Sequence, residues 1–187
     1  MIGNTREGWG WPARTLHWLI ALMVLGMFAF GLWMTDVPPR AERPFYFAIH
    51  ASVGITLLAL MLVRFFWWMG NVAPAPPEDT PAWQRKAAWL SHRLLYAVTF
   101  ATAVVGWFMS GTFEKPLEPK VFGLIAVPQP LSAGSPYNEL LEETHETLAF
   151  TLIALVCVHA AAALYHHFVL RDGVLRRMIA GAPMPKP

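Results

Sequence analysis

Four histidines are the residues of this chain best placed to do chemistry. His17, His50, His145 and His159 stand in or at the edges of long apolar stretches, where an imidazole is costly unless something binds it. His145 and His159 are 14 residues apart. At about 100° per residue, this spacing brings both side chains to nearly the same face of one helix, about 21 Å apart along its axis. One helix can therefore supply two ligands at two depths of a membrane.

The composition of the chain is that of a membrane protein. Of its 187 residues, 56% are hydrophobic and 14% are charged, which is too apolar for an ordinary soluble domain. Four apolar segments have about the 20 residues needed to cross a bilayer, and they run over residues 16–34, 45–68, 89–109 and 147–169. The connections between them are short or rich in proline. We therefore expect residues 1–187 to form a single all-α membrane domain, a bundle of four transmembrane helices.

Lysine and arginine are distributed unequally between the two ends of these segments. One side has ten, at Arg6, Arg14, Arg64, Arg85, Lys86, Arg93, Arg171, Arg176, Arg177 and Lys186, and the other has four, at Arg40, Arg43, Lys115 and Lys120. This asymmetry places both termini in the cytoplasm. Because the positive charge reports topology, we expect no nucleic-acid partner.

Depth in the membrane pairs the four histidines across helices. His17 and His159 stand toward the cytoplasmic side, and His50 and His145 toward the periplasmic side. Each pair places two imidazoles from different helices at one level, as a flat macrocycle with two axial nitrogen ligands requires. The simplest cofactor set is two stacked haems, an inner haem between His17 and His159 and an outer haem between His50 and His145.

Other metals fit these histidines less well. Zinc prefers four tetrahedral ligands, whereas each pair offers two nitrogens, and the carboxylates cluster in loops apart from Glu146 beside His145. Cys157 is the single cysteine, so the haems must be non-covalent b haems. Four residues after each proposed ligand stands a small side chain that leaves room for a macrocycle, at Ala21, Gly54, Ala149 and Ala163.

Further polar residues gather at the cytoplasmic ends of the third and fourth segments. His92 and Arg93, followed by Tyr96, can bind a quinone oxygen or relay a proton, or can form a structural or interfacial hydrogen bond. An interfacial position is the simpler reading for His166 and His167. Three arginines at segment ends can pair with haem propionates or serve as topological anchors, namely Arg14, Arg64 and Arg93.

Four stretches, in order along nearly the whole chain, resemble the bacterial cytochrome b561 family. They are TLHW at 15–18, RP at 43–44 leading to IHASVGI at 49–55, HETLA at 145–149 and HAAAALYHH at 159–167. The resemblance implies a four-helix dihaem cytochrome of the bacterial inner membrane, with the two histidine pairs named above as ligands. Members most similar to this pattern look like superoxide oxidases, which pass an electron from periplasmic superoxide through two haems to ubiquinone. Related cytochrome subunits of hydrogenases and formate dehydrogenases serve a bound partner.

The resemblance gives the expected path of the electron. Superoxide reduces the outer haem, and the electron moves to the inner haem and on to ubiquinone near the cytoplasmic surface. There His92, Arg93 or His166 supplies protons or hydrogen bonds to the quinone. The protein provides ligands, spacing and electrostatics, while the redox chemistry belongs to the cofactor.

The periplasmic loops carry more acidic than basic residues, which disfavours general steering of an anion. A steering patch for superoxide must therefore be local, and Lys115 and Lys120 in the long loop before the fourth segment are the candidates. A solvated loop face is the alternative for both. The apolar run over residues 121–127 either lies in the membrane interface as a lid over the outer haem or packs on the surface.

Three functions of different classes follow from these readings. The first is a self-contained superoxide:ubiquinone oxidoreductase. The second is a cytochrome b subunit that passes electrons between quinone and a partner dehydrogenase or hydrogenase, and it predicts partner chains that co-purify. The third is a membrane scaffold or transporter without redox function, and it predicts a colourless protein.

Overall fold

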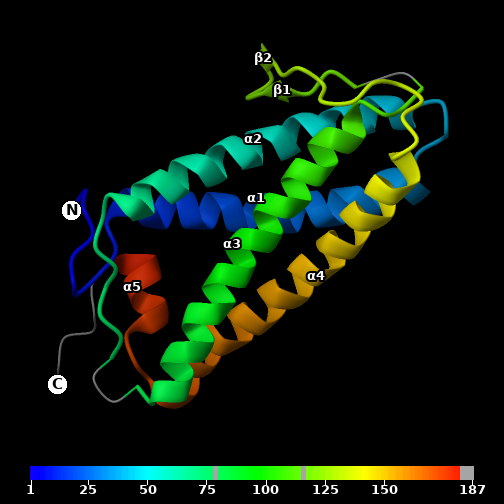
Figure 1. Cartoon of the computed structure of the whole chain (residues 1–187). Helices are drawn as coiled ribbons and strands as arrows, with labels where there is room; N and C mark the ends of the chain where they lie inside the picture. Colours follow the sequence, from blue (N-terminus) through cyan, green and yellow to red (C-terminus); the bar gives the residue numbers. More distant parts are fainter. Residues whose placement is uncertain (78–79, 115–116, 182–187) are drawn as a thin grey trace. The chain divides into compact units, whose positions relative to one another are not determined.

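The computed structural model describes residues 1–77, 80–114 and 117–181, most of which are helical (Figure 1). Four long helices follow one another, α1 (Trp11–Asp36), α2 (Arg43–Met69), α3 (Ala82–Ser110) and α4 (Asn138–Tyr165). A π-helix, η1 (His166–Leu170), continues α4, and the short helix α5 (Val174–Ala180) comes after it. Two short strands, β1 (Lys120–Val121) and β2 (Ile125–Ala126), lie in the connection between α3 and α4.

All four long helices are long and apolar enough to cross a membrane. Many of their large apolar side chains are exposed on the isolated chain, among them Leu22, Phe66 and Val158. Apolar side chains on the outside are expected where the solvent is lipid, because a helix satisfies its own backbone hydrogen bonds there. The chain is an all-α, multi-pass membrane protein, as the sequence predicts.

Two of the helices begin well before their apolar segments. Helix α3 begins at Ala82 and α4 at Asn138, whereas the apolar segments were expected to begin at Trp89 and Thr147. The added turns contain charged residues such as Lys86 and Glu142, which are good helix formers but too polar for the hydrocarbon core. The helices therefore extend beyond the length that a bilayer requires.

Packing divides the chain into two compact units, and each long helix contributes residues to both. The first unit comprises the described residues within 1–19, 62–96 and 154–187, and the second comprises those within 20–61 and 97–153. In the first unit, α5 is held by side chains of α1. The Arg14 guanidinium donates to the carbonyl of Ile179 at 2.6 Å, and the Trp18 indole donates to the carbonyl of Met178 at 3.0 Å.

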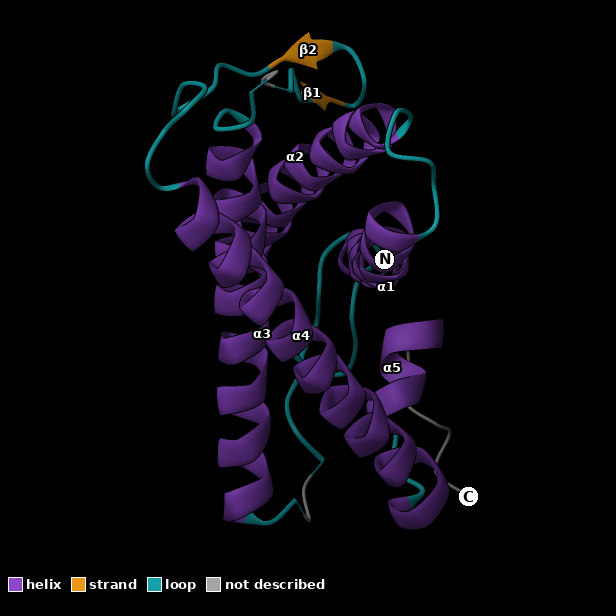
Figure 2. Ribbon diagram, turned by 90° about the vertical axis from the view of Figure 1, so that its right-hand side faces the viewer, coloured by secondary structure: helices purple, strands orange, loops and turns teal. Residues whose placement is uncertain are grey.

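The second unit has a small apolar core and a hairpin attached to α2. Ile55, Leu58 and Ala103 form the buried cluster. Strands β1 and β2 pair antiparallel beside α2 (Figure 2). The amide of Lys120 donates to the Ser52 hydroxyl at 3.2 Å, and that of Phe122 donates to the Thr56 hydroxyl at 2.8 Å. Ser52 and Thr56 lie one helical turn apart, so one face of α2 fixes the hairpin.

Candidate functional site

Each unit brings together one of the histidine pairs expected from the sequence. In the first unit, the ring centres of His17 on α1 and His159 on α4 are 6.2 Å apart, with the ring planes at 70°. In the second unit, the ring centres of His50 on α2 and His145 on α4 are also 6.2 Å apart, at 80°. Two imidazoles on opposite sides of one metal ion, with metal–nitrogen bonds of about 2 Å, have ring centres about 6 Å apart. Both pairs have this spacing.

The ring of His145 is fixed by a backbone hydrogen bond and by a glycine. Its Nδ1 lies 3.0 Å from the carbonyl oxygen of Thr102 on α3. A carbonyl can only accept, so Nδ1 carries the proton and Nε2 keeps a free lone pair. A Cβ added to Gly106, also on α3, would lie 2.8 Å from Cε1 of His145. The imidazole therefore occupies space that glycine alone leaves open.

The ring of His50 lies among aromatic and small residues of α1. Phe30 stacks on it at 6.2 Å between ring centres and 16° between planes. A Cβ added to Gly31 would come within 3.5 Å of Cε1 of His50, an ordinary contact distance. Nδ1 of His50 is buried and has no hydrogen-bond partner among the described residues. A buried polar atom without a partner is uncommon in folded proteins, so this ring is available to a ligand.

His92 lies beside one of the paired histidines. Its ring centre is 5.3 Å from that of His159, and its side chain forms a hydrogen bond with the backbone of Ala88, one turn earlier on α3. Near it in sequence, the phenol oxygen of Tyr96 accepts a hydrogen bond from Nε of Arg64 at 2.7 Å. The proximity of His92 to His159 is a feature that the sequence reading did not predict.

The other residues predicted for the quinone and superoxide sites each have different neighbours. The Arg93 guanidinium lies over the Trp89 ring, 3.7 Å from its centre, which is a cation–π contact. Lys120 is exposed on β1, and Lys115 lies outside the described residues. His166 contacts Asp172, with Nδ1 and Oδ2 2.5 Å apart.

The donor set of the described residues fits haem better than a bare metal ion. Within those ranges, no group of three or more histidine, cysteine or carboxylate side chains is arranged to hold a metal ion. Zinc needs three or four protein ligands, whereas the porphyrin of a b haem supplies four nitrogens and leaves two axial positions for the protein. The two histidine pairs fit that requirement. One ring nitrogen of His145 is free, and one ring nitrogen of His50 has no partner among the described residues.

Some residues that shape the site were missed from the sequence. Gly31 and Gly106 belong to helices that pack against the histidines, whereas the small residues expected from the sequence lie on the histidines' own helices. The Thr102 carbonyl is a backbone group with no sequence signal. Asp172 stands close to His166 in the sequence, but the pattern gives no sign that the chain turns back at this point.

Four membrane-crossing helices and two histidine pairs together define the class of multi-pass membrane cytochromes. Comparison with known families supports this class, because residues 8–181 match the family described as prokaryotic cytochrome b561. The chain belongs to this family, whose members bind b-type haem and transfer electrons across membranes.

Curated relatives cover most of the chain. It is 33% identical to cytochrome b561 homolog 2 of Escherichia coli over 178 residues, 94% of this chain and 93% of the relative. It is 29% identical to the probable superoxide oxidase CybB of Yersinia pestis over 165 residues, 88% of this chain and 91% of the relative. It is 30% identical to cytochrome b562 of Cereibacter sphaeroides over 173 residues, 88% and 90% of the two chains.

Proposed function

We propose that this protein is a superoxide:ubiquinone oxidoreductase of the bacterial inner membrane that holds two b haems. His50 and His145 bind the outer haem, and His17 and His159 bind the inner haem. The single observation that carries this proposal is the repeated 6.2 Å spacing of imidazole pairs, one in each unit. When bound, each haem supplies a one-electron Fe(III)/Fe(II) couple.

The proposed reaction balances with a two-to-one stoichiometry. Two superoxide anions each lose one electron and become two molecules of dioxygen. One ubiquinone takes up both electrons and two protons and becomes ubiquinol. Two one-electron carriers in one chain suit this reaction, because the donor gives single electrons and the acceptor requires two.

The residues around the outer pair orient one ligand and keep room for it. The Thr102 carbonyl holds the proton of His145 on Nδ1, which leaves Nε2 as the nitrogen that would bind a haem and would increase its basicity. Gly106 leaves space for the ring in this orientation. Phe30 stacks on His50. These contacts set the position of the ligands before the cofactor binds.

We place both termini, α5 and the beginning of α3 on the cytoplasmic side. The basis is the excess of basic residues at that end, among them Arg85, Lys86 and Arg176, under the positive-inside rule. The β-hairpin then lies on the periplasmic side, where superoxide arrives. Lys120 on this hairpin is exposed and attracts the anion, and the Ser52 hydroxyl fixes the backbone of the strand that carries it. Lys115 has the same proposed role.

The likeness to the Yersinia pestis protein supports the choice of donor, because that relative is named a probable superoxide oxidase. A second candidate is a cytochrome b subunit of a larger dehydrogenase or hydrogenase. It is favoured by the apolar tip of the hairpin, where Phe122 is 60% and Leu124 83% exposed, since an exposed apolar surface suits a protein partner. The acidic surplus of the periplasmic loops also agrees better with this second candidate.

Stopped-flow spectroscopy of the purified holoprotein tests the proposal. We expect superoxide to reduce the haems in a reaction that superoxide dismutase abolishes, and a soluble ubiquinone analogue to reoxidise them. Superoxide dismutase is the control, because it removes the donor and leaves the protein unchanged. Haems that stay oxidised under superoxide would refute the proposal, and partner chains co-purifying in equal amounts would favour the second candidate.

A further inference from the structure

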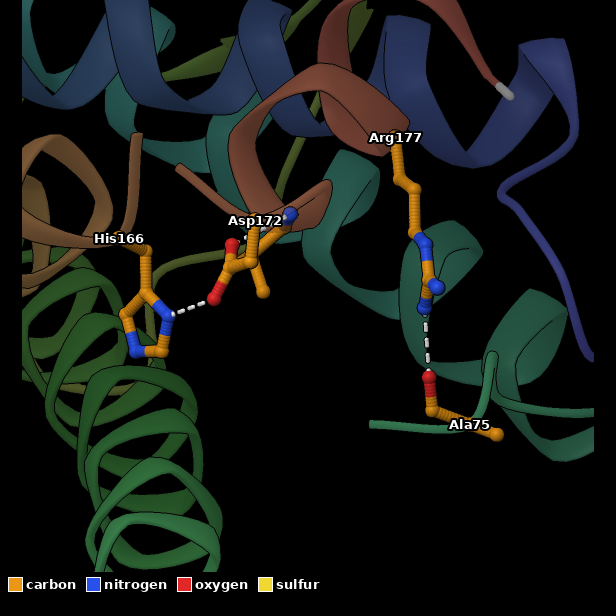
Figure 3. Close-up of polar contacts among 5 residues, drawn as sticks. Ala75, His166, Asp172 and Arg177 are labelled. Carbon is orange, nitrogen blue, oxygen red and sulfur yellow. Dashed lines mark hydrogen bonds and ion pairs between the residues drawn. The ribbon is translucent and has the colours of Figure 1, made fainter. Parts of the chain in front are cut away.

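The chain beyond α4 turns back and brings the carboxylate of Asp172 into contact with His166. Oδ2 of Asp172 lies 2.5 Å from Nδ1 of His166 (Figure 3). The two side chains are only 19% and 17% exposed. Both residues belong to the first unit. The contact is therefore a partly buried, charge-assisted hydrogen bond and differs from the flexible ion pairs of a protein surface.

Two unusual backbone features produce this contact. Helix α4 continues into the π-helix η1, which starts at His166 and is followed by Arg171 in a left-handed conformation with φ of 51°. The amides of Arg171 and Asp172 both donate to the carbonyl of His166, which closes the turn. π-helical turns occur frequently at functional sites. A left-handed residue other than glycine is strained and persists where the surrounding structure holds it.

The second oxygen of Asp172 is also used. Oδ1 accepts a hydrogen bond from the amide of Val174 at 2.9 Å, at the beginning of α5. That helix is tied down separately, because the Arg177 guanidinium donates to the carbonyl of Ala75 at 2.6 Å (Figure 3). The carboxylate is thus fixed by one hydrogen bond on each oxygen, and its orientation toward His166 is set by the fold.

We propose that His166 and Asp172 form the proton-donating pair for the quinone, with Asp172 as a positioning residue that acts through His166. This inference rests on the proposed function and deepens its acceptor side. The carboxylate accepts the Nδ1 proton, so Nε2 is the nitrogen that exchanges protons with a substrate. Tyr165 is the other titratable group in contact with this ring among those described, at 6.3 Å between ring centres.

The proton-transfer step is balanced. The Nε2–H bond of the protonated His166 ring breaks, and a new O–H bond forms on the reduced quinone oxygen. The ring becomes neutral and takes a new proton from cytoplasmic water. Two such transfers, together with the two electrons from two superoxide anions, convert one ubiquinone into one ubiquinol.

His92, the other quinone-site histidine expected from the sequence, is less suited to this role. His92 contacts His159, a proposed haem ligand, and its ring already forms a hydrogen bond with the backbone of Ala88. It has no carboxylate partner among the contacts of the described residues. His166 is seven residues beyond His159, outside that ligand pair.

The substitution Asp172→Asn tests the proposal in the full-length holoprotein. Asparagine keeps an oxygen for the Val174 amide but removes the charge and presents an NH₂ group to Nδ1. General acids contribute about 100-fold or more to a rate, so we expect kcat for reduction of a soluble ubiquinone analogue to fall at least about tenfold. We expect KM for the quinone to stay constant, and the solvent deuterium isotope effect to increase because proton transfer becomes rate-limiting.

A control variant and a double variant separate this role from a structural one. Arg177→Gln removes the tie of α5 to Ala75 without touching His166, so its kcat should equal that of the wild type. Asp172→Asn in a His166→Gln background should cost no further activity, because both residues act in one step. Unchanged kcat in Asp172→Asn, or an equal loss in Arg177→Gln, would overturn the inference. A wild-type protein that reduces no quinone would instead refute the proposed function.

Discussion

Replacing Gly106 by alanine is expected to remove the outer haem while leaving the inner haem in place. The new Cβ would lie 2.8 Å from Cε1 and 3.1 Å from Nδ1 of His145. An ordinary contact begins at 3.4 Å, so the ring must retreat by about 0.6 Å, the difference between 3.4 and 2.8 Å. The Thr102 carbonyl opposes this movement, because it holds the same ring from α3.

The size of the displacement decides the effect on the cofactor. Metal–ligand bonds tolerate shifts of about 0.2 Å, which is well below the required movement of the ring. Overpacking of this kind costs about 1–3 kcal/mol, and each 1.4 kcal/mol corresponds to a tenfold change in affinity. We therefore expect haem affinity at the outer site to fall by about 5- to 150-fold, enough to lose this haem during purification.

Two other glycine-to-alanine substitutions serve as matched controls. A Cβ on Gly26 meets nothing within 4 Å, and one on Gly31 meets Cε1 of His50 at the ordinary distance of 3.5 Å. Both variants should keep the wild-type haem content. Gly26→Ala should also be slightly more stable, because alanine favours a helix by up to about 1 kcal/mol over glycine.

The assay is a pyridine haemochrome determination per chain on each purified variant. The haem retained by Gly106→Ala shows that the protein is folded. A Gly106→Ala variant with wild-type haem content and an unchanged reduced-minus-oxidised spectrum would refute the assignment of His145 as a ligand in this orientation.

Two further predictions concern the ligands and the donor side. Replacing His17 or His159 by alanine should remove the inner haem alone, and replacing His50 or His145 the outer haem alone; a haem content that does not change in any one variant shows that its ligand is misassigned. Lys120→Glu should slow reduction by superoxide by up to about tenfold at low ionic strength, and the difference should shrink as salt is added. An equal rate in stopped-flow measurements at low salt would exclude steering by this residue.

The four membrane helices could be predicted from the sequence because the bilayer imposes a long apolar run on each one. Their ends could not, because the polar turns at the start of α3 and α4 lie outside the hydrocarbon and are set by helix propensity. Residues such as Lys86 and Glu142 favour a helix but lower the hydropathy of any window that contains them. The apolar run over residues 121–127 gave no sign of β1 and β2, which depend on the Ser52 and Thr56 hydroxyls of α2.

The histidine pairs could be predicted because helical spacing and membrane depth restrict which imidazoles can meet. The residues that support them depend on contacts between helices. Gly106 faces His145 across α3 and α4, and sequence spacing on one helix carries no information about such a neighbour. Asp172 reaches His166 through the left-handed conformation of Arg171, which is unusual for an arginine and was not expected from its sequence.

Every step of the proposed electron transfer requires this chain to bind two b haems through its two histidine pairs. The number of haems per chain, measured by pyridine haemochrome absorbance against quantitative amino-acid analysis of the purified protein, tests it most directly. We expect two b haems in each chain. One haem, or none, in a preparation saturated with haem would contradict it.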